Sequence, residues 1–229
     1  MSLNSIFKNA LAMLVATAVL VPVVQAADLG GRPTSYKDEP DYGAPRYLWT
    51  GLYLGATAGY GWGTSRQTDT GGTTTGDFDT DGFIGGGTLG YNFQRGQIVW
   101  GLETDLSYTD VSGGSFTNCA AGCSSSMDWL WTLRGRVGLD VNGWMPYITG
   151  GLAMADVSAV TQATSIGSET LTGWTIGGGL EVKLDRNWSF KTEYLFVDLG
   201  EMKGPLGADT IRADFNELHI VRGGINYKF

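Results

Sequence analysis

The sequence predicts an all-β fold: an eight-stranded antiparallel up-and-down transmembrane β-barrel with long extracellular loops and short periplasmic turns. Eight segments of about 10–15 residues alternate apolar and polar side chains with the period of two that is typical of a strand with two different faces. The connections between these segments alternate between short and long. Glycine contributes 36 of the 229 residues, and aromatic residues contribute 12%. This much glycine disfavours helices, whereas glycine and interfacial aromatic residues together are typical of curved membrane strands.

The N-terminus, residues 1–26, is expected to be a secretory signal peptide. Lys8 is the only charged residue before Asp28, and an apolar stretch follows it over residues 10–24. Val24-Gln25-Ala26 then supplies a small-residue cleavage site. A retained anchor helix is the weaker alternative, because the apolar stretch is shorter than the roughly 20 residues that a membrane helix needs.

Residues 27–48 carry three prolines and several charges without apolar periodicity, which indicates a periplasmic linker. The barrel domain is therefore expected to occupy residues 49–229. The net charge of the chain is −8, and it becomes −9 when Lys8 leaves with the signal peptide. Such acidity argues against a nucleic-acid partner, because phosphate binding needs a basic face.

The expected strands are long enough to cross a membrane at a tilt. In the third segment, one face carries Ile98, Trp100 and Leu102, while the other carries Glu103 and Asp105. Strands of soluble sandwiches are usually about five or six residues long, whereas membrane-barrel strands need about 9–11. The eight segments cover residues 50–62, 81–93, 98–109, 128–141, 145–157, 171–184, 187–199 and 214–229.

The connections divide into two groups, as in transmembrane barrels, where short periplasmic turns alternate with longer outside loops. The short group comprises residues 94–97, 142–144 and 185–186. The long group is rich in glycine, serine and threonine and is expected to form a solvated, antigen-like surface. It comprises residues 63–80, 110–127, 158–170 and 200–213.

The alternation places most charged strand residues inside the barrel. Acids and bases occur there in nearly equal numbers, and since a buried charge is costly unless it is paired, we expect ion pairs between strands. An eight-stranded barrel is just wide enough for side chains to fill, so we expect no general diffusion pore. The alternative, a catalytic acid/base pair as in glycoside cleavage, is disfavoured because substrate cannot enter. The expected lumen charge network comprises Glu103, Asp105, Arg134, Arg136, Asp140, Glu181, Lys183, Lys191, Glu193, Arg222 and Lys228.

The two cysteines, Cys119 and Cys123, are expected to form one local disulfide, because exported proteins mature in an oxidising compartment. A redox-active pair is the alternative, but no helix or fold context for such chemistry surrounds the two thiols. A zinc site would need more ligands than two thiols and the distant His219, so no metal site is expected.

Five motifs together resemble the small outer-membrane β-barrel proteins of alphaproteobacteria, the porin-family or outer-membrane immunogenic proteins. They are 49–55 (WTGLYLG), 82–92 (GFIGGGTLGYN), 146–151 (PYITGG), 173–181 (GWTIGGGLE) and 221–229 (VRGGINYKF). The resemblance implies an OmpA-like transmembrane barrel, integral to the outer membrane of a Gram-negative cell. It also implies that Ile225, Tyr227 and Phe229 form a signal read by the barrel-assembly machinery. It does not imply one activity, since members are described as envelope-structural, surface-antigenic and in some cases haem-binding.

We therefore expect a non-enzymatic barrel with an envelope-structural and surface-interaction role. The expected partners are outer-membrane lipid and lipopolysaccharide, the barrel-assembly machinery, and host or surface ligands of the loops. No cofactor is expected in this role. Haem or another small ligand at the extracellular rim is the alternative, with His219 as the candidate ligand. A lipid A-modifying enzyme using Glu217 and His219 is less favoured, because no serine lies two residues from His219 to act as nucleophile.

Overall fold

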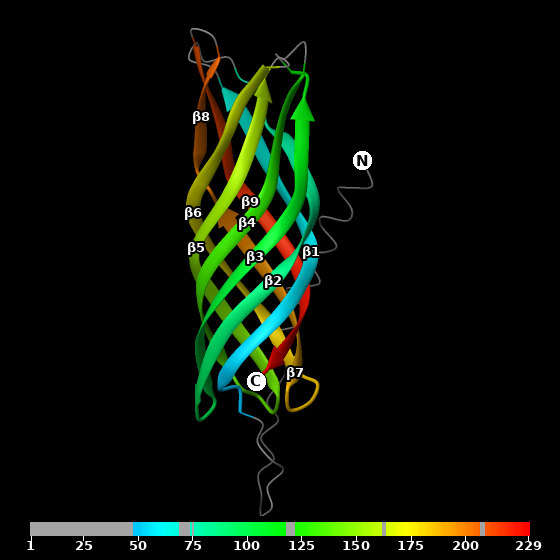
Figure 1. Cartoon of the computed structure of the whole chain (residues 1–229), viewed down its shortest axis with the longest axis vertical. Coiled ribbons are helices and arrows are strands. Elements are labelled where there is room, and N and C mark those ends of the chain that lie inside the picture. The colour runs from blue at the N-terminus through cyan, green and yellow to red at the C-terminus, as the bar shows by residue number, and fades with distance from the viewer. Residues whose placement is uncertain (1–47, 69–73, 75, 118–121, 162–163, 207–208) are drawn as a thin grey trace, which may run out of the picture. The chain divides into compact units, whose positions relative to one another are not determined.

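The structure, a computed structural model, describes residues 48–68, 74, 76–117, 122–161, 164–206 and 209–229. Within these residues the chain forms one antiparallel sheet that closes on itself (Figure 1). The expected signal peptide and nearly all of the linker lie outside the described residues, so these two boundaries stay predictions. The strands are β1 Gly51–Thr68, β2 Phe78–Arg95, β3 Ile98–Ser115, β4 Cys123–Leu139, β5 Trp144–Thr161, β6 Thr164–Lys183, β7 Trp188–Asp198, β8 Glu201–Leu206 and β9 Asp209–Lys228.

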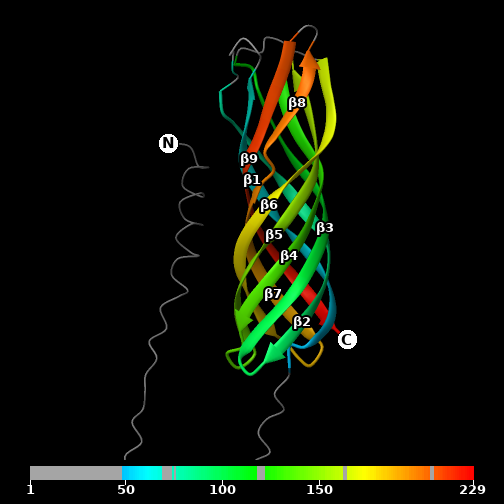
Figure 2. The ribbon, with the colours of Figure 1, turned by 90° about the vertical axis from the view of Figure 1, so that its left-hand side faces the viewer.

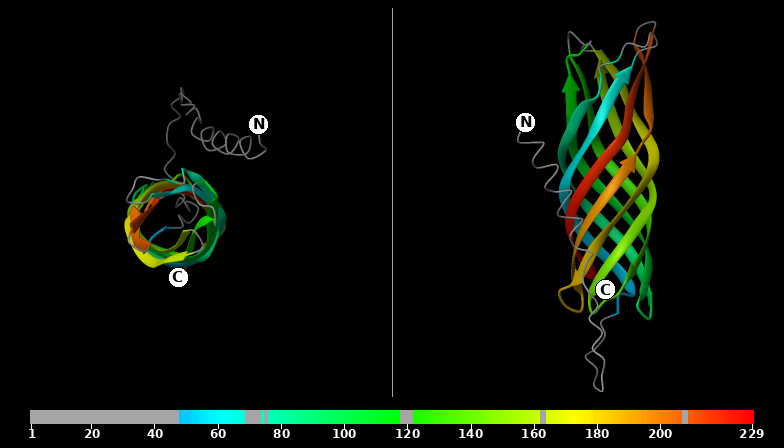
Figure 3. Two further views of the ribbon diagram at one scale, coloured as in Figure 1. Left: turned by 90° about the horizontal axis from the view of Figure 1, so that it is seen from above. Right: turned by 180° about the vertical axis from the view of Figure 1, so that it is seen from behind.

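The nine strands make an eight-stranded barrel, because β7 and β8 are two parts of one interrupted strand. Both pair with β9, one after the other along its length, and β9 in turn pairs with β1 to close the ring (Figures 2 and 3). The interruption falls at Gly200, whose φ of 78° lies in the left-handed region that glycine adopts without strain. The predicted eight-stranded antiparallel barrel is therefore confirmed.

The pairing register gives the barrel its tilt. A row of paired residues that starts at Trp62 in β1 passes to His219 in β9 and follows the ring back to β1. It returns at Leu52, so the stagger over one circuit is 62 − 52 = 10 residues. Such a stagger tilts the strands by about 35–45° and leaves a narrow interior that side chains fill.

The strands run farther than predicted at the end opposite the C-terminus. Most of the residues expected in the long loops, 63–80, 110–127, 158–170 and 200–213, belong to strands. The connections at this end are 69–77, 116–122, 162–163 and 207–208. Beyond the membrane neither face of a strand contacts lipid, so apolar and polar residues need not alternate. Serine, threonine and glycine continue the backbone hydrogen bonds of the strands there, but their sequence has no period of two.

The two faces of each strand differ as the alternation predicts. In β3, Ile98, Leu102 and Tyr108 expose 53%, 65% and 69% of their surface, whereas Glu103 and Asp105 are buried. The described part of the chain contains no helix that is both long and apolar enough to span a membrane.

Candidate functional site

The interior of the barrel has an apolar cluster near each end and a charged layer between them. Near the C-terminal end of the barrel, Trp49, Val99, Met145 and Tyr147 pack together. In the opposite half, a larger apolar cluster includes Ile84 and Leu195. The charged side chains between these clusters are the candidate functional site.

Glu103 in β3 is the centre of the charged layer. Its carboxylate accepts hydrogen bonds from Tyr53 Oη at 2.7 Å and Lys191 Nζ at 2.9 Å, and it pairs with Arg136 Nη1 at 3.3 Å. It also pairs with Arg134. Since Tyr53 lies in β1, both arginines in β4 and Lys191 in β7, this carboxylate joins β3 to strands on several sides of the lumen.

Arg222 in β9 bridges two further carboxylates. Its Nη1 lies 2.8 Å from Asp105 Oδ1, and its Nε donates to Glu193 Oε2 at 2.8 Å. Arg134 reaches the same two carboxylates, at 2.8 Å from Asp105 Oδ2 and 3.0 Å from Glu193 Oε1. The Thr132 hydroxyl donates to Asp105 at 2.6 Å. Two arginines and two carboxylates therefore form a closed set of pairs.

Glu181 in β6 completes the layer near the short turns. Its carboxylate accepts hydrogen bonds from Arg136 Nη2 and Ser189 Oγ, each at 2.5 Å, and from Asn226 Nδ2 at 2.8 Å. The Arg136 guanidinium also lies 4.4 Å from the centroid of the Tyr147 ring, a cation–π contact. Every carboxylate of the layer therefore has a cationic partner, and none is left as a free base for acid/base chemistry.

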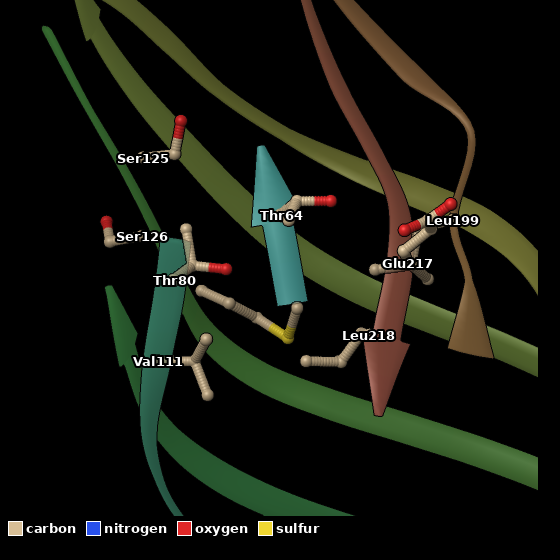
Figure 4. A pocket seen from close by; sticks show the side chains of 9 residues that line it. Thr64, Thr80, Val111, Ser125, Ser126, Leu199, Glu217 and Leu218 are labelled. Carbon is tan, nitrogen blue, oxygen red and sulfur yellow. The ribbon is translucent and has the colours of Figure 1, made fainter. Parts of the chain in front are cut away.

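We call these four acids and four bases the charged network. Each member exposes 3% or less of its surface, which marks the whole group as inaccessible to a solute. A cavity of about 20 Å³ lies among Val111, Met127, Leu218 and neighbouring residues in the half away from the C-terminus, with room for about one water molecule (Figure 4). The network comprises Glu103, Asp105, Glu181, Glu193, Arg134, Arg136, Lys191 and Arg222.

Three residues expected in the network lie elsewhere. Asp140 follows the end of β4, where its carboxylate accepts hydrogen bonds from Gln94 Nε2 at 3.0 Å and Gly143 N at 3.1 Å. Lys183 and Lys228, at the last residues of β6 and β9, lie at the same end of the barrel. The alternation gave the side of the strand for these residues, but it did not give their height along the barrel axis.

The network also has uncharged partners, which the predicted set of paired charges does not include. Tyr53, Tyr147, Ser189 and Asn226 each donate a hydrogen bond to a network carboxylate. Their inward parity was the available signal. For Tyr53 and Tyr147 this signal is weak, because β1 and β5 carry small or apolar side chains on both faces. Ser189 and Asn226 share the inward parity of Lys191 and Arg222, but they carry no charge.

His219 lies on the outer face of β9, half-buried among aromatic side chains. Its Nδ1 is 2.7 Å from the Tyr194 hydroxyl oxygen, and its ring centroid lies 5.8 Å from Trp62 and 5.4 Å from Phe196. Glu217 is exposed on the same face and pairs in register with Thr64. The described residues contain no group of three or more histidine, cysteine, aspartate or glutamate side chains placed to hold a metal ion.

Cys119, one half of the expected disulfide, lies outside the described residues. The Cys119–Cys123 pairing therefore stays a prediction. Ile225, Tyr227 and Phe229 share the outer side of β9 and its end, and Phe229 exposes 68% of its surface. Their role as an assembly signal likewise stays a prediction.

The family of this barrel follows from its similarity to known proteins. The family model for the outer membrane protein beta-barrel domain matches residues 14–229. The chain belongs to this outer-membrane β-barrel family. It is 34% identical over 186 residues to the 25 kDa outer-membrane immunogenic protein of Brucella abortus biovar 1 (strain 9-941), with 81% of this chain and 82% of that protein covered. It is 36% identical over 191 residues to the 22 kDa outer membrane protein of Rhizobium leguminosarum bv. viciae, with 81% and 80% covered.

A solved structure supports the same fold for this outer-membrane barrel. The crystal structure of the outer membrane protein OprG from Pseudomonas aeruginosa matches with a TM-score of 0.54 and 16% identity, covering 79% of this chain and 96% of that chain. At this identity the likeness shows the fold alone. The expected resemblance to small alphaproteobacterial outer-membrane proteins and the outer-membrane location are confirmed by the family match and the relatives.

The location fixes the orientation of the outer-membrane barrel. The short turns and the C-terminus lie at the periplasmic end, as in other bacterial barrels. Aromatic girdles mark both membrane interfaces. The periplasmic girdle includes Phe93 stacked on Trp100 at 4.5 Å between ring centroids, and the extracellular girdle includes Trp62, Phe196 and His219.

Proposed function

We propose that this outer-membrane barrel is a closed envelope protein with a structural and surface-interaction role, and that it is neither a general diffusion pore nor an enzyme. The charged network is the observation that carries the proposal. Its eight charges lie within 3.3 Å of opposite charges and fill the lumen near its middle. A solute would have to separate these pairs in a low-dielectric interior, where each unpaired charge costs several kcal/mol.

The extracellular hairpins supply the proposed interaction surface. They continue beyond the extracellular girdle as polar strands, which leaves their side chains available to lipopolysaccharide and to host or surface ligands. Relatives in Brucella are named outer-membrane immunogenic proteins, and these names support the proposed surface-interaction role.

Liposome swelling tests the proposed closure of the lumen to small solutes. The purified barrel is refolded into liposomes, which are then diluted into an isotonic solution of a small neutral sugar, with a general-diffusion porin as positive control. We expect swelling at the rate of protein-free liposomes. A swelling rate that rises with the amount of barrel would overturn the proposal.

Haem binding is the second proposal, and the Tyr194–His219 contact is the observation that favours it. Tyrosine and histidine are both haem ligands in proteins, and this pair lies on an outer face beside aromatic rings. Haem titration of the wild type, His219→Ala and Tyr194→Phe tests it. Loss of the absorbance change in either variant is expected, and three identical spectra would overturn it.

A lipid A-modifying activity is not proposed. Serine hydrolase chemistry needs a serine nucleophile that is hydrogen-bonded to its base, whereas His219 Nδ1 is hydrogen-bonded to the Tyr194 hydroxyl. Mass spectrometry of lipid A from cells that overproduce the barrel checks this, and we expect an unchanged mass.

A further inference from the structure

A short segment before β1, residues 48–50, is held inside the periplasmic mouth of the barrel. Trp49 exposes only 3% of its surface, although it precedes the first strand, whereas its neighbour Leu48 exposes 54%. The Trp49 backbone N–H donates to Gln94 Oε1 at 2.7 Å, and the Gln94 N–H donates to Thr50 Oγ1 at 2.9 Å. These reciprocal bonds fix the segment to β2.

Side chains from other strands hold the same segment. Lys183 Nζ at the end of β6 lies 4.4 Å from the centroid of the Trp49 ring, a cation–π contact. Lys228 Nζ at the end of β9 donates to the Leu48 carbonyl at 2.6 Å. The two lysines that were expected in the central network therefore act at the periplasmic mouth instead.

The Trp49 ring lies on the periplasmic side of the charged network. It packs with Val99, Met145 and Tyr147, and the Tyr147 hydroxyl donates to the network carboxylate Glu193 at 2.9 Å. One layer of apolar side chains thus separates the periplasm from the buried charges. Water at these charges would weaken their pairing, because the strength of an ion pair falls as the local dielectric rises.

We propose that Trp49 is a periplasmic plug, a second closure of the lumen in series with the charged network. The inference rests on the proposed function, because a second closure in series requires that the charged network already closes the lumen. It assigns separate roles to the two layers: Trp49 keeps periplasmic water and solutes from the network, and the network by itself prevents passage through the barrel.

Cysteine accessibility tests the plug directly. Val99→Cys, 1% exposed in the wild type and packed against Trp49, is introduced with Cys119 and Cys123 replaced by serine. Each folded variant, verified by its heat-modifiable gel migration, is treated with a water-soluble maleimide. The exposed turn position Gln97→Cys gives the reference rate of an open site.

We expect Val99→Cys to react at least about tenfold more slowly than Gln97→Cys while Trp49 is present. Trp49→Ala is expected to bring the Val99→Cys rate close to the reference. Trp100→Ala is the matched control, because Trp100 lies on the neighbouring outward position and exposes 51% of its surface. It is expected to leave Val99→Cys protected.

The labelling results test the closure by Trp49, and the swelling results test the closure by the charged network. Rapid labelling of Val99→Cys with Trp49 in place overturns the plug, and this measurement needs no destabilising substitution. Unchanged protection in folded Trp49→Ala also overturns it. Swelling of liposomes that contain Trp49→Ala, but not of those with the wild type, would overturn the series arrangement. Swelling with the wild type instead contradicts the proposed function, whatever the labelling result.

Discussion

Replacing Glu103 by glutamine removes the central charge of the network and retains the shape of the side chain. Lys191 Nζ lies 2.9 Å from Glu103 Oε2, and at an effective dielectric constant of about 20 this pair alone corresponds to about 6 kcal/mol of attraction. Desolvation of both ions offsets much of that attraction. Breaking a buried pair by removing one partner typically costs about 3–5 kcal/mol, because the other charge stays buried without compensation. We therefore expect Glu103→Gln to lower the free energy of unfolding by about 3–5 kcal/mol.

Urea unfolding of the refolded barrel in lipid vesicles, followed by tryptophan fluorescence, measures this change. Glu217→Gln is the matched control, because Glu217 is exposed on the outer face, and we expect a change within about 0.5 kcal/mol. Adding Lys191→Met to Glu103→Gln removes the uncompensated ammonium, and the cycle should show a coupling of about 0.5–3 kcal/mol. A Glu103→Gln barrel within about 1 kcal/mol of the wild type would refute the reasoning that the network is a set of buried, desolvated pairs.

Three further substitutions test the packing and the turns, each by urea unfolding. Gly90→Ala should destabilise by about 1–3 kcal/mol, because a Cβ there would lie 2.3 Å from the Tyr53 ring, whereas Gly87→Ala, with its nearest atom at 3.9 Å, should be neutral. Tyr53→Phe should cost about 1–3 kcal/mol through the lost hydrogen bond to a buried carboxylate, and an effect no larger than that of the outward Tyr91→Phe would contradict the contact. The backbone N–H groups of Asn187 and Trp188 donate to Asp185 and hold its pKa below the usual 3.8. The stability that the wild type has over Asp185→Asn should therefore be full above pH 3.8 and decline as the pH falls below it. A stability difference that is constant with pH would rule out the charge effect.

The sequence was most informative where the membrane imposes contrast between the two faces of a strand. Leu102 and Glu103 are neighbours in β3, and one must face lipid while the other cannot, so their sides followed from the alternation alone. The same contrast predicted the inward side of Arg134 and Arg222. This contrast disappears in the extracellular hairpins, where serine, threonine and glycine occupy both faces, and there the strands extend beyond their predicted ends.

The partners across the lumen could not be predicted, because they depend on the stagger of the closed ring. Glu103 and Lys191 are 88 positions apart in the chain and meet only once the ten-residue stagger sets their heights. Lys183 lies on the same face of β6 as Glu181, but it is closer to the periplasmic end of the barrel and does not reach the network. Trp49 is the first residue of the predicted barrel domain, and its burial in the mouth depends on side chains of three other strands.

Planar-bilayer conductance shows directly whether buried ion pairs close the lumen. The purified wild-type barrel is inserted into a planar lipid bilayer, and the current is recorded under a constant voltage in concentrated salt. We expect no steady conductance above that of the protein-free bilayer. A large, steady conductance step with each insertion would contradict it.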